Sequence, residues 1–90
     1  MGLDRFKEGR YVWVPYDPIN DTPSHFAKIV KVDDKIQEGD NKMFKWYWVF
    51  ITVEGPFGKD TYPSHFLGAT CDISDEEYAE YLKYCKPYRV

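Results

Sequence analysis

The stretch Met43–Val53, MFKWYWVFITV, constrains the fold most, because it is largely β-branched and aromatic and carries a single charge. Such side chains fit a pleated, half-buried surface, so the stretch predicts a β-strand. Successive side chains of a strand point to opposite faces, and here both faces are bulky. We therefore expect a central strand with a neighbour on either side. We also expect large aromatic residues in the core, namely Trp13, Phe44, Trp48 and Phe50.

Two further strands are predicted before this stretch and one after it. Arg10–Tyr16 (RYVWVPY) alternates in the way typical of a strand. Phe26–Val32 (FAKIVKV) has irregularly spaced apolar residues, which predicts a bend or a β-bulge. Lys59–Phe66 (KDTYPSHF) predicts a short strand that is interrupted at Pro63, because proline has no N–H for the ladder. Between the second strand and the aromatic stretch, the polar segment Asp33–Lys42 predicts a loop.

The last predicted element is an α-helix over residues 74–86. Ser74 is a good N-cap, and Glu77 follows three residues later, which is the spacing of a capping box. One apolar stripe runs along the predicted helix at helical spacing, so we expect the helix to pack by this face. The stripe consists of Tyr78, Tyr81, Leu82 and Cys85.

A chain of 90 residues is long enough for one domain with a modest core. Short strands, polar loops and one terminal helix are typical of a small, bent antiparallel barrel. The predicted fold class is therefore mainly β: a barrel or roll of about five strands with one C-terminal α-helix over residues 74–86, in a single domain over residues 1–90. An α+β roll with an open sheet covered by the helix is the alternative.

Charge and composition exclude several classes of partner. The net charge is −3 and the lysines and arginines are scattered, so no basic patch is predicted, although a small base-stacking site for nucleic acid stays open. No apolar run approaches the ~20 residues of a membrane span, and no secretory signal is present. We expect a soluble, cytoplasmic protein with no membrane partner. Cys71 and Cys85 form neither a disulfide framework nor a metal motif, and we expect no cofactor and no metal.

The tetrapeptide Pro-Ser-His-Phe occurs twice, at Pro23–Phe26 and at Pro63–Phe66, and these copies contain both histidines of the chain. Each copy predicts a corner between a loop and a strand. If the corners adjoin, His25 and His65 form an acid/base pair suited to phosphodiester cleavage, or they share a binding role. The alternative is that the same loop-ending chemistry was used twice without a common function.

Exposed aromatic residues are the second candidate for function. A domain this small cannot bury all of Tyr16, Trp46 and Tyr47, so we expect one or two of them at the surface. Exposed rings offer a platform for a base or a cage for a cationic side chain. The predicted partner-binding residues are Tyr16, His25, Trp46, Tyr47 and His65.

Two short patterns resemble known families. Gly9–Val14 (GRYVWV) followed by Phe26–Val30 (FAKIV) resembles the start of SH3-like barrels of the Tudor and PWWP kind. That resemblance implies a five-stranded barrel capped by a C-terminal helix, with a ligand-reading aromatic cage. Val12–Pro18 (VWVPYDP) is similar to the opening of MazF-type RNA-cutting toxins, and His25 lies near the place of their catalytic loop arginine.

These observations favour a non-enzymatic module that binds a protein partner through exposed aromatic residues beside the first loop. The alternative is an RNA-binding or RNA-cleaving, toxin-like domain that uses His25 and His65. A third hypothesis is a small acidic accessory or phage-type inhibitor of viral origin, because five acidic side chains lie within residues 72–80. The oligomeric state is not predicted by any of these patterns.

Overall fold

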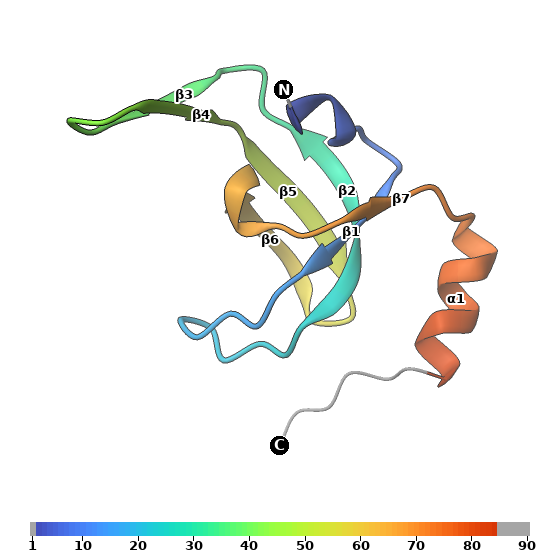
Figure 1. Ribbon diagram of the computed structural model, residues 1–90. Coiled ribbons are helices and arrows are strands. Elements are labelled where there is room, and N and C mark those ends of the chain that lie inside the picture. The colour runs from blue at the N-terminus through green and yellow to red at the C-terminus, as the bar shows by residue number, and fades with distance from the viewer. Residues whose placement is uncertain (1, 85–90) are drawn as a thin grey trace.

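The structure, a computed structural model, describes residues 2–84 (Figure 1). Five of the strands form one antiparallel sheet in the order β6-β5-β2-β1-β7, in which the last strand returns to pair with the first. These strands are β1 (Tyr11–Val14), β2 (His25–Val32), β5 (Phe50–Gly55), β6 (Gly58–Pro63) and β7 (Thr70–Cys71). The mainly β fold class with one C-terminal helix is confirmed.

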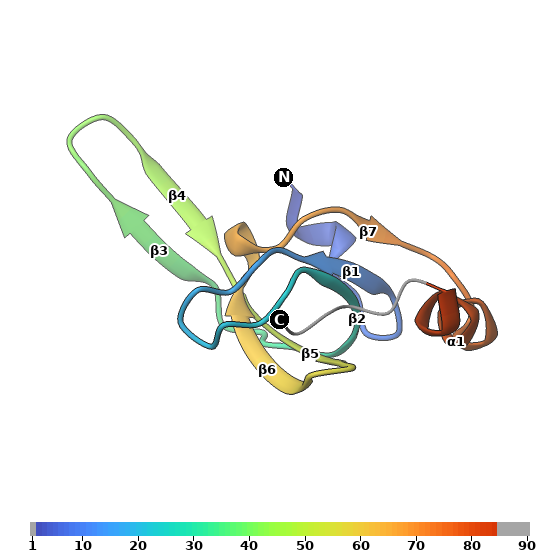
Figure 2. The same ribbon diagram turned by 90° about the horizontal axis from the view of Figure 1, so that it is seen from below.

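The remaining two strands form a hairpin that projects from the five-stranded sheet (Figures 1 and 2). They are β3 (Gln37–Asp40) and β4 (Lys45–Trp48), paired antiparallel. Two predictions are therefore wrong. Asp33–Lys42 is not a loop throughout, because it contains β3. Met43–Val53 is not one strand, because the strand is interrupted at Val49, between β4 and β5. Within the stretch Met43–Val53, it is only β5 that has a neighbouring strand on either side, namely β2 and β6. Two neighbours were predicted for the whole stretch.

The core is formed mainly by branched aliphatic side chains, and its buried aromatic residues are Phe6, Tyr11 and Tyr62. Along β5 the buried residues alternate, and Ile51 and Val53 face inward while Phe50 is 37% exposed. Phe44 is 60% exposed, so the assignment of Phe44 and Phe50 to the core is wrong. The buried cluster contains Phe6, Val12, Val14, Ala27, Ile29, Val49, Ile51, Val53, Tyr62 and Leu67. Branched aliphatic side chains fill the interior of this bent sheet, and the bulkier alternate face is turned outward.

Irregular spacing in the second strand has the predicted consequence. The pairing of β2 with β5 shifts register between Ile29 and Lys31, which is the expected bulge. A bulge increases the local twist of a strand, and β2 curves strongly across the sheet (Figure 1).

The C-terminal helix α1 (Asp75–Tyr84) begins at the predicted capping box. The Glu77 N–H donates to Ser74 Oγ at 3.0 Å, and the Ser74 N–H donates to Glu77 Oε1 at 3.1 Å. Residues 85 and 86 of the predicted helix, and with them Cys85 of the stripe, lie outside the described residues.

One face of α1 packs on the sheet through Tyr78. Its ring centroid lies 4.3 Å from that of Tyr11, and its hydroxyl donates to the Phe26 carbonyl at 2.6 Å. Burial and the neighbouring Tyr81 raise the pKa of Tyr78 to about 12. Across residues 2–84, no helix has the length and apolar character needed to cross a membrane.

Two short 3₁₀ helices complete the fold. They are η1 (Gly2–Arg5), which precedes β1, and η2 (Ser64–Phe66), which follows β6. The second helix lies between β6 and β7, at the end of the sheet from which the hairpin departs.

Candidate functional site

The repeated Pro-Ser-His-Phe sequence adopts two different structures. The first copy leads into β2 as predicted, with Ser24 exposed and His25 only 4% exposed. The second copy ends β6 and forms η2 instead of opening a strand, with Ser64 2% exposed and His65 exposed. Identical side chains therefore have opposite environments in the two copies.

Ser64 fixes the point at which the hairpin leaves the sheet. The Val49 N–H donates to Ser64 Oγ at 3.1 Å, and the Ser64 N–H donates to the Val49 carbonyl at 2.8 Å. A buried backbone group left without a partner is costly, so the serine hydroxyl satisfies the amide that the strand break would otherwise leave unpaired. This pair anchors β4 beside η2.

Aromatic side chains form a continuous row from the hairpin to η2. Ring centroids are separated by 5.6 Å from Phe44 to Trp46, by 6.4 Å from Trp46 to Trp48, and by 5.5 Å from Trp48 to His65. We call Phe44, Trp46, Trp48 and His65 the aromatic row. Facing residues of a hairpin share a side of the sheet, and Gly39 lies opposite Trp46, so no side chain of β3 covers the indole there.

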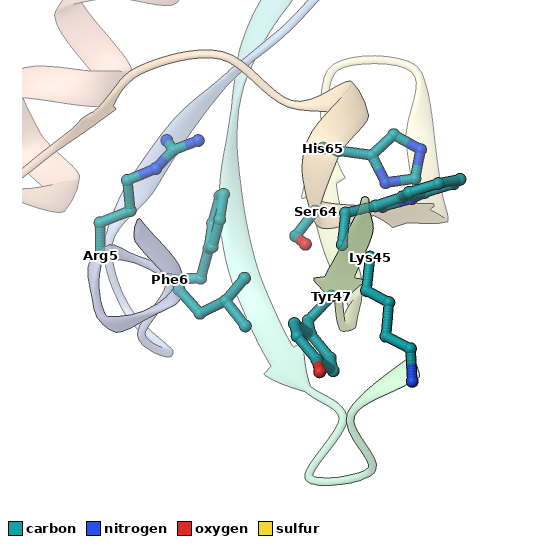
Figure 3. Close-up of a pocket in the computed structure, with 8 residues that line it drawn as sticks. Arg5, Phe6, Lys45, Tyr47, Ser64 and His65 are labelled. Atoms are coloured by element: carbon teal, nitrogen blue, oxygen red, sulfur yellow. The ribbon is translucent and has the colours of Figure 1, made fainter. Parts of the chain in front are cut away.

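A pocket of about 460 Å³ lies at the base of the hairpin, between the N-terminal segment and β4 (Figure 3). Figure 3 shows Arg5 and Phe6 on one side of it, with Tyr47 and Ser64 on the other. Its lining residues are Leu3, Arg5, Phe6, Lys45, Trp46, Tyr47, Ser64 and His65. The structure thus brings together three of the predicted partner-binding residues, Trp46, Tyr47 and His65.

The N-terminal side of this pocket was not predicted. Leu3–Glu8 is too short and mixed for a pattern to classify it, and no sequence signal places it beside β4. The Arg5 guanidinium carbon lies 4.0 Å from the centre of the Phe6 ring, and its Nη1 donates to the Gly68 carbonyl. Arg5 is therefore positioned by one contact with the next residue and one with Gly68, far along the chain.

The other two predicted residues lie elsewhere. Tyr16 is 53% exposed, and its hydroxyl donates to Asp21 Oδ1 at 2.9 Å, which raises the pKa of Tyr16. The buried His25 hydrogen-bonds through Nδ1 to the Pro23 carbonyl at 2.7 Å, and its ring meets Phe57 edge-on.

The two histidines lie near opposite ends of β5. The His25 ring would lie 3.3 Å from a Cβ atom at Gly55, which is the last residue of β5. His65 comes two residues after Pro63, and Pro63 pairs with Phe50, the first residue of β5. Five steps along a strand span roughly 17 Å. This separation is too large for both imidazoles to act on one scissile bond, because proton transfer requires hydrogen-bond reach or a single bridging water.

A buried carboxylate organises the loop between β1 and β2. Asp17 Oδ1 accepts the Ile19 N–H at 3.0 Å, and Oδ2 accepts the Tyr62 hydroxyl at 3.1 Å and the Asn20 side-chain amide at 2.8 Å. Burial alone would raise the pKa of Asp17, but these hydrogen bonds outweigh it and lower the pKa. Because its oxygens are occupied by these hydrogen bonds, the Asp17 carboxylate has a structural role.

A second cavity, of about 350 Å³, lies beside this loop and is lined by Asp17, Tyr62 and Phe66 among others.

Comparisons with protein-family models, with curated proteins and with solved structures gave no match to this chain.

Proposed function

We propose that this chain is a non-enzymatic interaction module that binds a protein partner through the aromatic side chains at the base of the β3–β4 hairpin. The observation that carries this proposal is the pocket lined by Trp46, Tyr47 and His65. Trp46 is 37% exposed and Tyr47 is 46% exposed. Tyrosine and tryptophan are enriched among residues that dominate binding energy at protein interfaces.

The exposed aromatic area is worth a moderate amount of binding energy. If a whole aromatic side chain buries 150–250 Å², the exposed parts of Trp46 and Tyr47 sum to about 170 Å². Covering that area contributes about 4 kcal/mol at 25 cal/mol per Å². Association costs about 4–15 kcal/mol, so the aromatic contacts need support from polar or charged groups.

A protein partner is favoured over nucleic acid by the charges of the hairpin. Lys42 and Lys45 are balanced there by Glu38 and Asp40, and Lys45 Nζ lies 3.2 Å from Glu38 Oε1. Binding to a phosphate backbone needs clustered cations that release counterions. Rings alone would stack bases, but single-strand binders combine stacking with a positively charged groove.

Two-histidine cleavage of RNA is not proposed. The roughly 17 Å span of β5 lies between the surroundings of His25 and those of His65, and His25 is buried. An inhibitor that acts through its acidic helix is likewise not favoured, because Asp75 already accepts hydrogen bonds from Tyr11 and Lys28.

We also propose that the fold is SH3-like. Support comes from the strand order β6-β5-β2-β1-β7, in which the last strand returns to the first after a single turn of 3₁₀ helix. The C-terminal helix supports the same interpretation. Since one fold hosts many functions, the interaction proposal rests on the pocket and not on this likeness.

The test is affinity capture from cells in which the chain occurs, with the intact chain compared with a Trp46→Ala/Tyr47→Ala variant. We expect a protein that the intact chain retains and the double variant loses by roughly tenfold or more, which is about 1.4 kcal/mol. Ile19→Ala is the control, because Ile19 is 91% exposed on a different loop. Recovery of RNA in place of protein, or equal capture by all three chains, would overturn the proposal.

A further inference from the structure

We infer that the pocket at the base of the hairpin selects a partner segment in which a carboxylate side chain lies next to an apolar one. This inference rests on the protein-binding function proposed above. The pocket is lined by basic side-chain types, Arg5, Lys45 and His65, and by none of the 15 acidic residues of the chain. In a chain of net charge −3 the pocket lining itself therefore carries no negative charge, and the nearest acidic partner of its lysine is Glu38.

The apolar half of the specificity comes from the same pocket. Phe6 is 5% exposed and belongs to the hydrophobic core, and Leu3 packs against that core. With Trp46 and Tyr47 these side chains form an apolar lining beside the basic groups. A purely charged segment would leave this apolar lining uncovered, and a purely apolar one would desolvate the cations with only the Gly68 carbonyl and Glu38 to compensate.

The Arg5 side chain is ordered by contacts within the chain, and its charge is not used in an ion pair with the described residues. Among the ion pairs of residues 2–84 none includes Arg5. Its side chain is nevertheless positioned, by the Gly68 carbonyl on one side and the Phe6 ring on the other. A cation that is already ordered loses less conformational entropy when it binds, so its contribution to affinity is larger.

Lys45 forms a weak ion pair with Glu38, which would compete with a carboxylate of the partner. Its Nζ lies 3.2 Å from Glu38 Oε1, and the two side chains are 57% and 51% exposed. Exposed pairs of this kind contribute little to stability, so a carboxylate of the partner can displace Glu38. Removing Glu38 should therefore strengthen binding of the partner. A purely apolar docking site does not predict this increase in affinity.

A carboxylate fits this pocket better than a phosphate group. Phosphate sites on proteins are generally built from several arginines or from backbone N–H groups that converge on the anion. The pocket supplies one arginine and one lysine, and Figure 3 shows their charged ends at opposite ends of it, so no cluster of cations converges on one anion.

The experiment begins with a display library of random short peptides selected on the full chain. Recovered peptides are then synthesised, and their affinities are measured by fluorescence anisotropy. We expect enrichment of Asp or Glu beside Leu, Phe or Trp. Lys45→Gln should weaken these peptides roughly fivefold to tenfold, and Glu38→Gln should tighten them severalfold. Lys42→Gln removes an exposed lysine that does not line the pocket, and is the matched control that should leave affinity unchanged.

Each outcome has a distinct meaning. Peptides that lose binding with Trp46→Ala but carry no acidic enrichment, or that respond equally to Lys42→Gln and Lys45→Gln, would overturn this inference and leave the protein-binding function standing. If no recovered peptide depends on Trp46 or Tyr47, the proposed function fails and the inference fails with it. Arg5→Lys and Arg5→Gln, checked for folding by circular dichroism, give a second measurement: the lysine variant should retain acidic peptides better than the glutamine variant.

Discussion

The indole of Trp46 occupies the space that a side chain at residue 39 would need. A Cβ atom at Gly39 would lie 2.2 Å from Trp46 Cε2 and 2.6 Å from Nε1. Glycine at this position of β3 is therefore required for the observed position of the indole, although glycine otherwise weakens a strand. The aromatic row owes its position over the hairpin to the missing side chain on the neighbouring strand.

Gly39→Ala should displace the Trp46 indole and weaken partner binding by about the same factor as Trp46→Ala. In the Trp46→Ala background Gly39→Ala should instead raise the free energy of unfolding, because alanine is preferred to glycine in a strand interior by roughly 0.5–1 kcal/mol. Urea unfolding of the two single variants and the double variant measures this coupling. Equal effects of Gly39→Ala in both backgrounds would contradict the contact.

Ser64→Ala should lower the free energy of unfolding by about 1–3 kcal/mol, because it leaves the buried Val49 N–H without its acceptor. Faster hydrogen exchange of the Val49 amide is the local readout. The chain supplies its own matched control: Ser24→Ala alters the exposed serine of the other Pro-Ser-His-Phe copy and should stay within about 0.5 kcal/mol of the parent. Comparable losses in the two variants would show that Ser64 does not anchor the strand break.

Asp17→Asn should destabilise the chain at neutral pH by about 1 kcal/mol, because the ionised carboxylate accepts several hydrogen bonds. The pKa of Asp17 is lowered in the folded state, so its contribution is complete above the ordinary value of 3.8 and is lost as the pH falls through the folded value. The stability difference between parent and variant should therefore shrink below about pH 4. Unfolding by urea across this range tests it, with the exposed Asp34→Asn as the control.

Tyr78→Phe should cost about 1 kcal/mol at pH 7, because it removes the hydrogen bond to the Phe26 carbonyl. The pKa of Tyr78 rises from an ordinary 10.0 to about 12 on folding, so its contribution is complete below pH 10 and declines as the pH rises toward 12. The variant should lose less stability than the parent over that interval. Tyr81→Phe, which keeps the ring contact with Tyr78, is the control at pH 7.

Local signals in the sequence were sufficient wherever the deciding contacts are close along the chain. The capping box joins Ser74 and Glu77, three residues apart, and both of its hydrogen bonds form. The bulge in β2 follows from the spacing of apolar residues within one strand. Alternation along β5 marked which positions share a face, although not which face would be inside.

The candidate site was predicted only in part. One or two of Tyr16, Trp46 and Tyr47 were expected at the surface because a small domain cannot bury every aromatic residue, and all three are exposed. Arg5 and Phe6 were missed because their role depends on facing β4, some forty positions away, across the pocket. Nothing in the Pro-Ser-His-Phe sequence distinguishes His25, which is buried, from His65, which lies at the pocket.

The sequence by itself determined the mainly β class, the helix start and the bulge, because these depend on side-chain periodicity and on contacts within a few residues. Only the tertiary structure decided that MFKWYWVFITV divides at Val49, since the hydroxyl that satisfies this amide comes from Ser64, fifteen residues later. The division sends Phe44, Trp46 and Tyr47 out along the hairpin while Ile51 and Val53 enter the core. A long-range hydrogen bond to a buried amide has no local signature, and here it separates the core half of the stretch from the half that carries the candidate site.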